Sequence, residues 1–117
     1  NLSTPDEIRL PLLWIAVLHG RLRASLGATR GVHTPVEVVK YLMAGADAVM
    51  TTSALLKNGV DYMTTLRDGL QTWMEMHRYA SVAQMKGSMS QRNVADPTAF
   101  ERANYIKTLE SYKSDYI

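Results

Sequence analysis

The sequence predicts an α/β fold that is built around one strand–helix–strand unit and is helical elsewhere. Residues 25–29 and 46–51 are short runs of small and apolar residues, which is typical of fully buried strands. A T-P-x-E sequence that starts at Thr34 indicates a helix between them, and Gly45 is placed to end that helix. Strands joined by a helical crossover are parallel, so both carboxyl ends lie at the same edge of the sheet.

The helix of this unit has signals at its start and along its length. Pro35 suits the first helical position because it lacks an amide hydrogen, and Glu37 can reach back to the capping residue. Val36, Val39 and Met43 recur at i, i+3 and i+7, which predicts one apolar side.

The segment before the first strand is predicted to be a helix with an interruption. Thr4 can cap it, Pro5 suits its first turn, and Glu7 completes a capping box. Pro11 should kink or restart the helix. Residues 12–18 are apolar nearly all round, so we expect burial on more than one side, against another subunit or another segment of the parent protein.

The segment after the second strand is predicted to be further helices. Residues 61–79 form an amphipathic helix, and Ser81 with Gln84 makes a second capping box. Asp96 caps a last helix that runs to about Tyr112. The apolar positions that repeat along the long helix are Tyr62, Leu66, Leu70 and Trp73.

Backbone amides at the carboxyl edge of the sheet predict an anion site. The turns at Arg30-Gly31 and Thr52-Ser53 follow the two strands, so their N–H groups point into one shared space. Residues 53–56 are a candidate short helix that starts there. In (β/α)8 barrels a phosphate site lies after strands 7 and 8, at the N-terminus of a short extra helix.

Four segments resemble one family. They are GVHTPVEVVKYLMAGADAVMTTSALL (31–56), KNGVDYMTTLRDGLQTWM (57–74), RLPLLWIA (9–16) and KGSMSQRN (86–93). Together they resemble the bacterial proteins called dihydroorotate dehydrogenase-like, in the class 1 dihydroorotate dehydrogenase group, over nearly the whole chain. The resemblance implies α/β architecture of the FMN-binding (β/α)8 TIM barrel, with this chain as its C-terminal part.

The resemblance also implies how the chain is divided. It would be a single partial domain over residues 1–117 that contains about strands 7–8 and their helices, and it would be helix-rich in isolation. Its parts would be the helix that precedes strand 7 (1–24), the phosphate-binding unit (25–56), the last barrel helix (57–80) and a helical C-terminal extension (81–117).

The function implied is an FMN-dependent oxidoreductase that converts dihydroorotate to orotate in the cytoplasm. Arg30, Gly31, Thr52 and Ser53 would hold the FMN phosphate, although the family commonly has glycine in place of Arg30 and Thr52. The family's catalytic base, its lysine near the flavin and its orotate-binding asparagines lie mostly upstream. No catalytic residue is therefore assigned in this chain, which we expect to be an inactive C-terminal fragment of the parent protein.

Two alternatives remain open. Other FMN barrels, such as glutamate synthase-like or nitronate-oxidising enzymes, contain a similar unit. The second alternative is a non-catalytic assembly or phosphate-binding piece, because a two-stranded sheet has two exposed edges and needs partners. For the isolated chain we accordingly expect self-association, or docking on the missing part of the barrel.

Composition excludes several classes of site. The net charge is +2 with scattered Lys and Arg, whereas a nucleic-acid surface needs a concentrated basic face. The chain has no Cys, which excludes disulfides and thiolate metal sites. The apolar run at 10–18 is too short for a membrane span of about 20 residues. No two histidines have a helical metal spacing, so no metal is expected, and His33 and Asp47 are predicted to be a surface turn residue and a turn acceptor.

Overall fold

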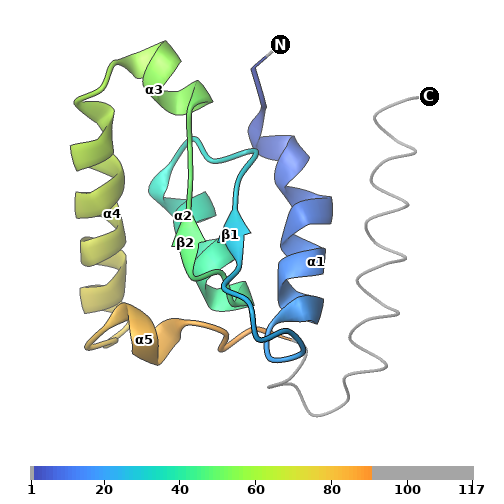
Figure 1. Ribbon diagram of the computed structural model, residues 1–117. Coiled ribbons are helices and arrows are strands. Elements are labelled where there is room, and N and C mark those ends of the chain that lie inside the picture. The colour runs from blue at the N-terminus through green and yellow to red at the C-terminus, as the bar shows by residue number, and fades with distance from the viewer. Residues whose placement is uncertain (1, 91–117) are drawn as a thin grey trace.

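The computed structural model describes residues 2–90, which form a helix-rich α/β arrangement around a two-stranded parallel sheet (Figure 1). The predicted α/β class is therefore confirmed. In chain order the elements are the 3-10 helix η1 (Pro5–Ile8), α1 (Arg9–Leu18), β1 (Gly27–Ala28), α2 (Pro35–Ala44), β2 (Ala48–Val49), α3 (Ser53–Asn58), α4 (Tyr62–Met76) and α5 (Val82–Met85).

The two strands are parallel, as predicted, but shorter than the runs 25–29 and 46–51. Gly27 pairs with Ala48, and Ala28 pairs with Val49. Flanking bonds extend the pairing slightly, since the amide of Met50 donates to the carbonyl of Ala28 at 2.8 Å. Within residues 2–90 no third strand pairs with β1 or β2, so both outer edges are open.

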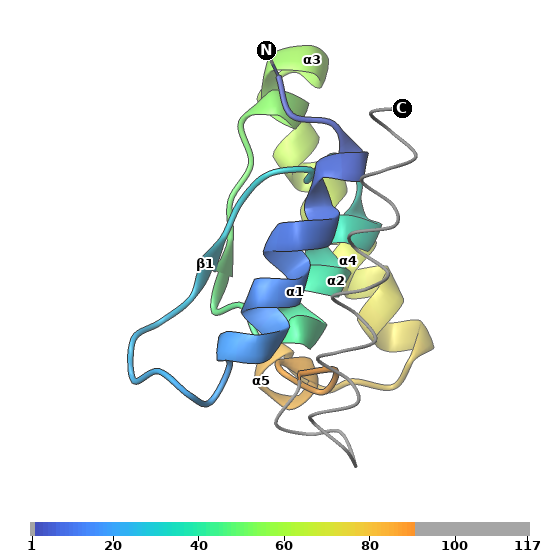
Figure 2. The ribbon, with the colours of Figure 1, turned by 90° about the vertical axis from the view of Figure 1, so that its right-hand side faces the viewer.

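One face of the sheet is covered by helices and the other is not. Figure 2 shows α1, α2 and α4 on the same side of the strands. On the opposite side, Gly27 and Ala48 are exposed, Met50 is 51% exposed, and the terminal methyl of Met50 lies near Gly27. We call these three residues the uncovered face. The prediction of fully buried strands is wrong here, because the described helices cover a single side.

The core lies between the sheet and the helices and consists of two clusters. The first joins α1, α2 and β1, and the second lies where α2, α4 and α5 meet. Tyr41 of α2, which the apolar pattern did not include, is fully buried in the first cluster. Val36, which the pattern did include, is exposed. The buried members are Ile8, Ile15, Ala16, Ala28, Val32, Tyr41, Ala44 and Ala46 in the first cluster, and Val39, Leu42 and Met85 in the second.

Local signals set the helix boundaries. The capping box of Thr34 and Glu37 forms, and Gly45 ends α2 with a positive φ of 126°. The first helix restarts as predicted, because η1 gives way to α1 at Arg9, just before Pro11. The capping box expected there does not form, since the Glu7 carboxylate lies 3.4 Å from the Arg30 guanidinium instead.

Helix α1 is buried on more than one side, as predicted, with only Trp14 exposed among the residues at its centre. Helix α4 packs closely on the start of α2, because a Cβ added at Gly69 would lie 2.2 Å from the Pro35 ring. The buried positions of α1 are Leu13, Ile15, Ala16 and Val17.

Helix α5 begins as predicted, with the Ser81 hydroxyl accepting from the Gln84 amide at 3.2 Å. The segment after it runs beneath α2, where the Gly87 amide donates to the carbonyl of Leu42. The helix predicted from Asp96 lies outside the described residues. Among residues 2–90 no helix combines the length and apolar character that crossing a bilayer requires.

Candidate anion site at the carboxyl edge of the sheet

The turn after β1 has an unusual backbone. Arg30 and Gly31 both have positive φ, 84° and 75°. Glycine adopts this region freely, whereas for arginine it is strained, and such strain in folded proteins concentrates at functional sites.

The buried side chain of Tyr41 holds this turn by hydrogen bonds to its backbone. Its hydroxyl lies 3.0 Å from the carbonyl of Thr29 and 2.8 Å from that of Arg30, so its single proton is shared between the two oxygens. Burial raises the pKa of Tyr41 to about 12, and the positive charge of Arg30 opposes that shift. The phenol therefore stays protonated and keeps both carbonyls turned toward the core.

The end of β2 is tied to the same turn. Thr51 donates its hydroxyl to the carbonyl of Val32 at 2.8 Å, which holds the two carboxyl ends together. Helix α3 then begins at Ser53, so the short helix predicted from residue 53 is confirmed. Thr52, the residue before it, is exposed.

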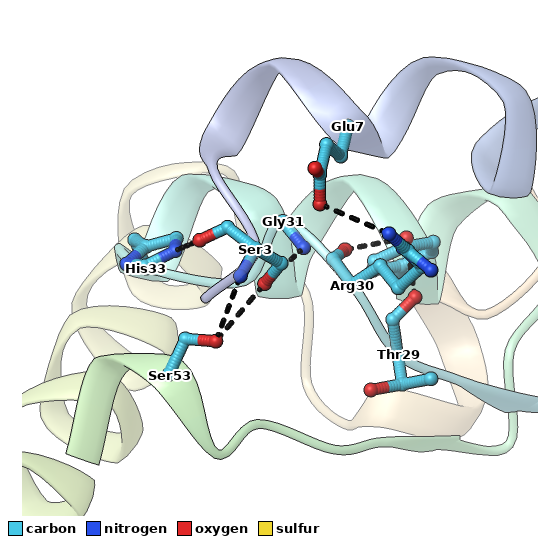
Figure 3. A network of polar contacts seen from close by, with 8 residues as sticks. Ser3, Glu7, Thr29, Arg30, Gly31, His33 and Ser53 are labelled. Carbon is cyan, nitrogen blue, oxygen red and sulfur yellow. Dashed lines mark hydrogen bonds and ion pairs between the residues drawn. The ribbon is translucent and has the colours of Figure 1, made fainter. Parts of the chain in front are cut away.

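Ser3 lies between the two turns (Figure 3). Its hydroxyl accepts from the Gly31 amide at 3.3 Å and lies 3.1 Å from the hydroxyl of Ser53. Its own amide donates to the Ser53 hydroxyl at 3.2 Å. The segment before η1 therefore joins the two strand ends at what we call the carboxyl edge.

The four predicted site residues are placed differently. Gly31 and Ser53 are brought together through Ser3, while the Arg30 side chain is 64% exposed and turns away toward Glu7. Gly31 is buried beneath η1, because a Cβ added there would lie 2.9 Å from the amide nitrogen of Ile8, the last residue of η1, and 3.1 Å from the Thr4 carbonyl. The Gly31 amide is thus already bonded and covered by the chain itself.

His33 is not the surface residue that was predicted. It is half-buried, and its Nε2 lies 2.6 Å from the carbonyl of Ser3. Its amide donates to the buried Glu37 carboxylate, and its carbonyl accepts from the hydroxyl of Tyr62. The ring therefore fixes the backbone of Ser3, which the sequence pattern alone did not indicate.

The opposite, amino edge of the sheet is held by a different set of side chains. Asp47 accepts from the Leu26 amide at 2.8 Å and pairs with the Lys86 ammonium at 2.7 Å. These hydrogen bonds, with the Lys86 contact first, hold the pKa of Asp47 below its usual value. Asp47 is thus a turn acceptor, as predicted.

His19 has a packing role at this edge. It follows α1 and lies against Gly45 and Gly87, so that a Cβ added at either glycine would approach its side chain to 2.5 Å or 2.3 Å. These contacts join the ends of α1 and α2 to the segment after α5.

The chemistry of the carboxyl edge is that of neutral donors. Its polar side chains are the hydroxyls of Ser3, Thr52 and Ser53, which can donate to an anionic oxygen, since the Gly31 amide is already bonded to Ser3. No group of three His, Cys, Asp or Glu residues that could hold a metal occurs within the described part of the chain. No family model matches this sequence, and no curated protein matches it either.

Proposed function

We propose that this chain is part of an FMN-dependent (β/α)8 barrel of the dihydroorotate dehydrogenase type and that it supplies the end that binds the FMN phosphate. The observation that carries the proposal is the shape of the strand–helix–strand unit. It is parallel, covered by helices on one face and uncovered on the other, with polar turns gathered at its carboxyl edge.

The uncovered face supports a barrel. In a (β/α)8 barrel the helices form an outer ring, and the inner faces of the strands pack against one another. A segment of two strands taken alone would expose its inner face and both of its edges. Gly27, Ala48 and Met50 are apolar residues exposed on that face, and β1 and β2 are each open on one side within residues 2–90.

The carboxyl edge supports a phosphate ligand. The turn at Gly31 and the start of α3 lie within reach of one residue, Ser3, so they border a common space. Two strand ends followed by a short helix is where barrels place a phosphate. Because residues 31–56 resemble the dihydroorotate dehydrogenase group, FMN is the phosphate compound that we propose as the ligand.

In this function FMN, this chain and the remainder of the parent protein have separate tasks. When bound, FMN supplies the hydride-transfer chemistry, and the protein supplies position and electrostatics. Ser53 and the turn at Gly31 would orient the phosphate, and Thr52 would stand at its exposed side. The proton acceptor and the contacts to the flavin ring and to dihydroorotate would come from the remainder of the parent protein.

The first experiment is to measure the intact mass of the polypeptide that carries this sequence in its source. A barrel of roughly 250 residues or more is expected. The purified polypeptide should release FMN on acid treatment and should reduce or oxidise a dihydroorotate–orotate pair. A native product of 117 residues without flavin would contradict the proposal.

Substrate tests separate the related barrels. Oxidation of a nitronate or formation of glutamate, without turnover of dihydroorotate, would place the parent among the other FMN barrels. Removal of the Ser53 hydroxyl by Ser53→Ala should weaken FMN binding in any of these enzymes, because each needs its phosphate held. Ser53→Thr is the matched control, since it keeps the hydroxyl.

A non-catalytic assembly piece is the second candidate, and exposed apolar surface favours it. Leu56 is 67% exposed and Val60 is 78% exposed at the corner between α3 and α4, in addition to the uncovered face. Such surface in a small chain promotes association. Light scattering on the 117-residue chain should then give a dimer or larger, and a monomer that unfolds cooperatively would contradict this candidate.

A further inference from the structure

The sequence contains a single Asn-Gly pair, Asn58-Gly59, which lies at an outer corner of the molecule where α3 ends and the chain turns into α4 (Figure 1). We infer that Asn58 is a site of spontaneous deamidation and that the last turn of α3 controls the rate. The inference concerns a covalent modification of this chain, and it does not depend on the proposed function.

The reaction uses only atoms of the pair, base and water. The Gly59 amide nitrogen loses its proton to base and attacks Cγ of the Asn58 side chain. A bond forms between these two atoms, the Cγ–Nδ2 bond breaks, and Nδ2 takes up a proton and leaves as ammonia. The product is a cyclic imide, a succinimide. Water then opens the ring at either of its carbonyl carbons, which leaves aspartate or its β-linked isomer, isoaspartate, at position 58.

The surroundings of the pair leave the reacting atoms accessible. Asn58 and Gly59 are both exposed, so base and water can reach them. Gly59 has no side chain that would hinder ring closure, and a Cβ added there would meet no atom within 4 Å. Its φ of 90° shows that the chain has already left helical geometry at this residue.

Two hydrogen bonds of the last turn of α3 oppose the reaction. The Gly59 amide, which is the nucleophile, donates to the carbonyl of Leu55 at 2.8 Å. The Asn58 side-chain amide donates to the carbonyl of Ala54 at 2.9 Å, which draws Cγ back along α3 and away from the Gly59 nitrogen. Both bonds must break before the ring can close. Because helix ends open more readily than the rest of a fold, this opening needs no global unfolding.

The second pair of this type in the sequence, Asp68-Gly69, has a different environment. Asp-Gly forms the same ring with loss of water, but this pair lies in the interior of the 15-residue helix α4. Gly69 is also packed against the ring of Pro35, where an added Cβ would lie 2.2 Å away. Ring closure there would have to break α4 and its contact with α2. The structure therefore distinguishes two pairs that the sequence presents as similar.

Deamidation removes support from the end of α3. A carboxylate at position 58 has no proton to donate to the carbonyl of Ala54. Its negative charge would also stand at the carboxyl end of α3, where the helix dipole disfavours it. Isoaspartate adds a carbon to the main chain at the same place. The modified chain therefore opens more easily at this corner than the unmodified one.

The test is to incubate the 117-residue chain at mildly alkaline pH, with and without urea, and to follow the peptide that contains residue 58 by mass spectrometry. We expect the folded chain to convert Asn58 to aspartate and isoaspartate about thirtyfold more slowly than the chain in urea, the factor for two ordinary hydrogen bonds. Asn93 and Asn104 are internal references, since Val94 and Tyr105 hinder attack, and both should stay unmodified over the same period.

The ratio of the two rates decides the inference. Equal rates in the folded chain and in urea would overturn the control by α3. A ratio above about a thousand would mean that only global unfolding exposes the pair, and it would overturn the inference as well. Reaction at Asp68 in the folded chain, faster than at Asn58, would contradict the distinction between the two pairs.

A matched pair of variants tests the control by α3 without urea. Leu56 lies in the last turn of α3 and is 67% exposed, so its side chain can be removed with little loss of packing. Leu56→Gly weakens the helix, whereas Leu56→Ala preserves it, so deamidation should be about fourfold faster in the glycine variant. Equal rates in the two variants would show that opening of α3 does not limit the reaction.

Discussion

The two edges of the sheet are held by different kinds of side-chain contact. At the amino edge, His19 packs against two glycines and Asp47 pairs with Lys86, so side chains fill the space. At the carboxyl edge, Ser3 and Ser53 meet by hydroxyl contacts over a strained turn at Arg30. Ligands of parallel sheets bind outside the carboxyl ends of the strands. The comparison shows that side-chain packing stabilises the amino edge, so that the carboxyl edge can present polar groups.

The largest effect is expected at the amino edge, from Gly45→Ala. The new methyl would lie 2.5 Å from the His19 Cβ, and φ at this position is 126°. Overpacking and the left-handed conformation together should lower the free energy of unfolding by roughly 3 kcal/mol. Urea denaturation measures the change. In the matched background His19→Gly, which lacks that Cβ, part of the loss should disappear, and an equal loss in both backgrounds would contradict the packing role of His19.

The second-largest effect is expected at the carboxyl edge, from Tyr41→Phe. Tyr41→Phe removes the hydroxyl that donates to Thr29 and Arg30 and leaves two carbonyls without it. We expect a loss of about 1.5 kcal/mol in the free energy of unfolding. NMR shifts of the amides in the turn should move, whereas those around Lys86 should not. Loss of stability with no change in the turn would contradict the assignment.

Tyr41 also predicts a pH dependence. Its pKa is raised from 10.0 to about 12, so the unfolded chain loses this proton first. The stabilisation is fully present below pH 10 and is lost as the pH rises toward 12. The difference in stability between the unmodified chain and Tyr41→Phe should therefore shrink over this range. A constant difference would show that the phenol is not held protonated by the fold.

A smaller effect is expected from Asp47→Asn. Asparagine still accepts from the Leu26 amide but no longer pairs with the Lys86 charge, and solvent screens that pair, so about 0.5 kcal/mol should be lost. Because the folded pKa of Asp47 lies below 3.8, the contribution is present above that pH and is lost as the pH falls. Denaturation at neutral pH and below pH 3.8 compares the two chains, and the difference should vanish only in acid.

The smallest effect is expected from Arg30→Gly. Glycine relieves the positive φ of 84°, but it adds freedom to the unfolded chain and removes the exposed pair with Glu7. The net change should be within about 0.5 kcal/mol. Arg30→Ala keeps the strain and loses the pair, so it should be less stable than Arg30→Gly by about 1 kcal/mol. Equal thermal midpoints for the two variants would argue against strain in this turn.

Sequence predicted best what depends on near neighbours. The capping box at Thr34 depends on a residue three positions later, and the end of α2 depends on Gly45 alone. The long helix α4 follows from a repeat at helical spacing, although it ends at Met76 rather than near residue 79. The order of helices and strands within residues 2–90 was available from such local signals.

Sequence did not predict contacts between distant segments. Ser3 meets Ser53 across 50 positions, and His19 lies against Gly87 across 68 positions (87 − 19). Tyr41 looked like one more side chain of α2, since nothing near it in sequence indicates that its hydroxyl reaches the turn at Arg30. The four predicted site residues lie in the two turns that Ser3 joins, but Ser3 itself was not among them.

The uncovered face has a chemical consequence through its methionine. Met50 is 51% exposed there, whereas Met85 is fully buried. Peroxide converts accessible methionine to the sulfoxide far faster than buried methionine. The ratio of oxidation at Met50 to that at Met85, read by peptide mass spectrometry, therefore reports whether this face is covered. Any partner that closes it, whether the rest of a barrel or a second copy, would slow the reaction at one sulfur and leave the other as an internal reference.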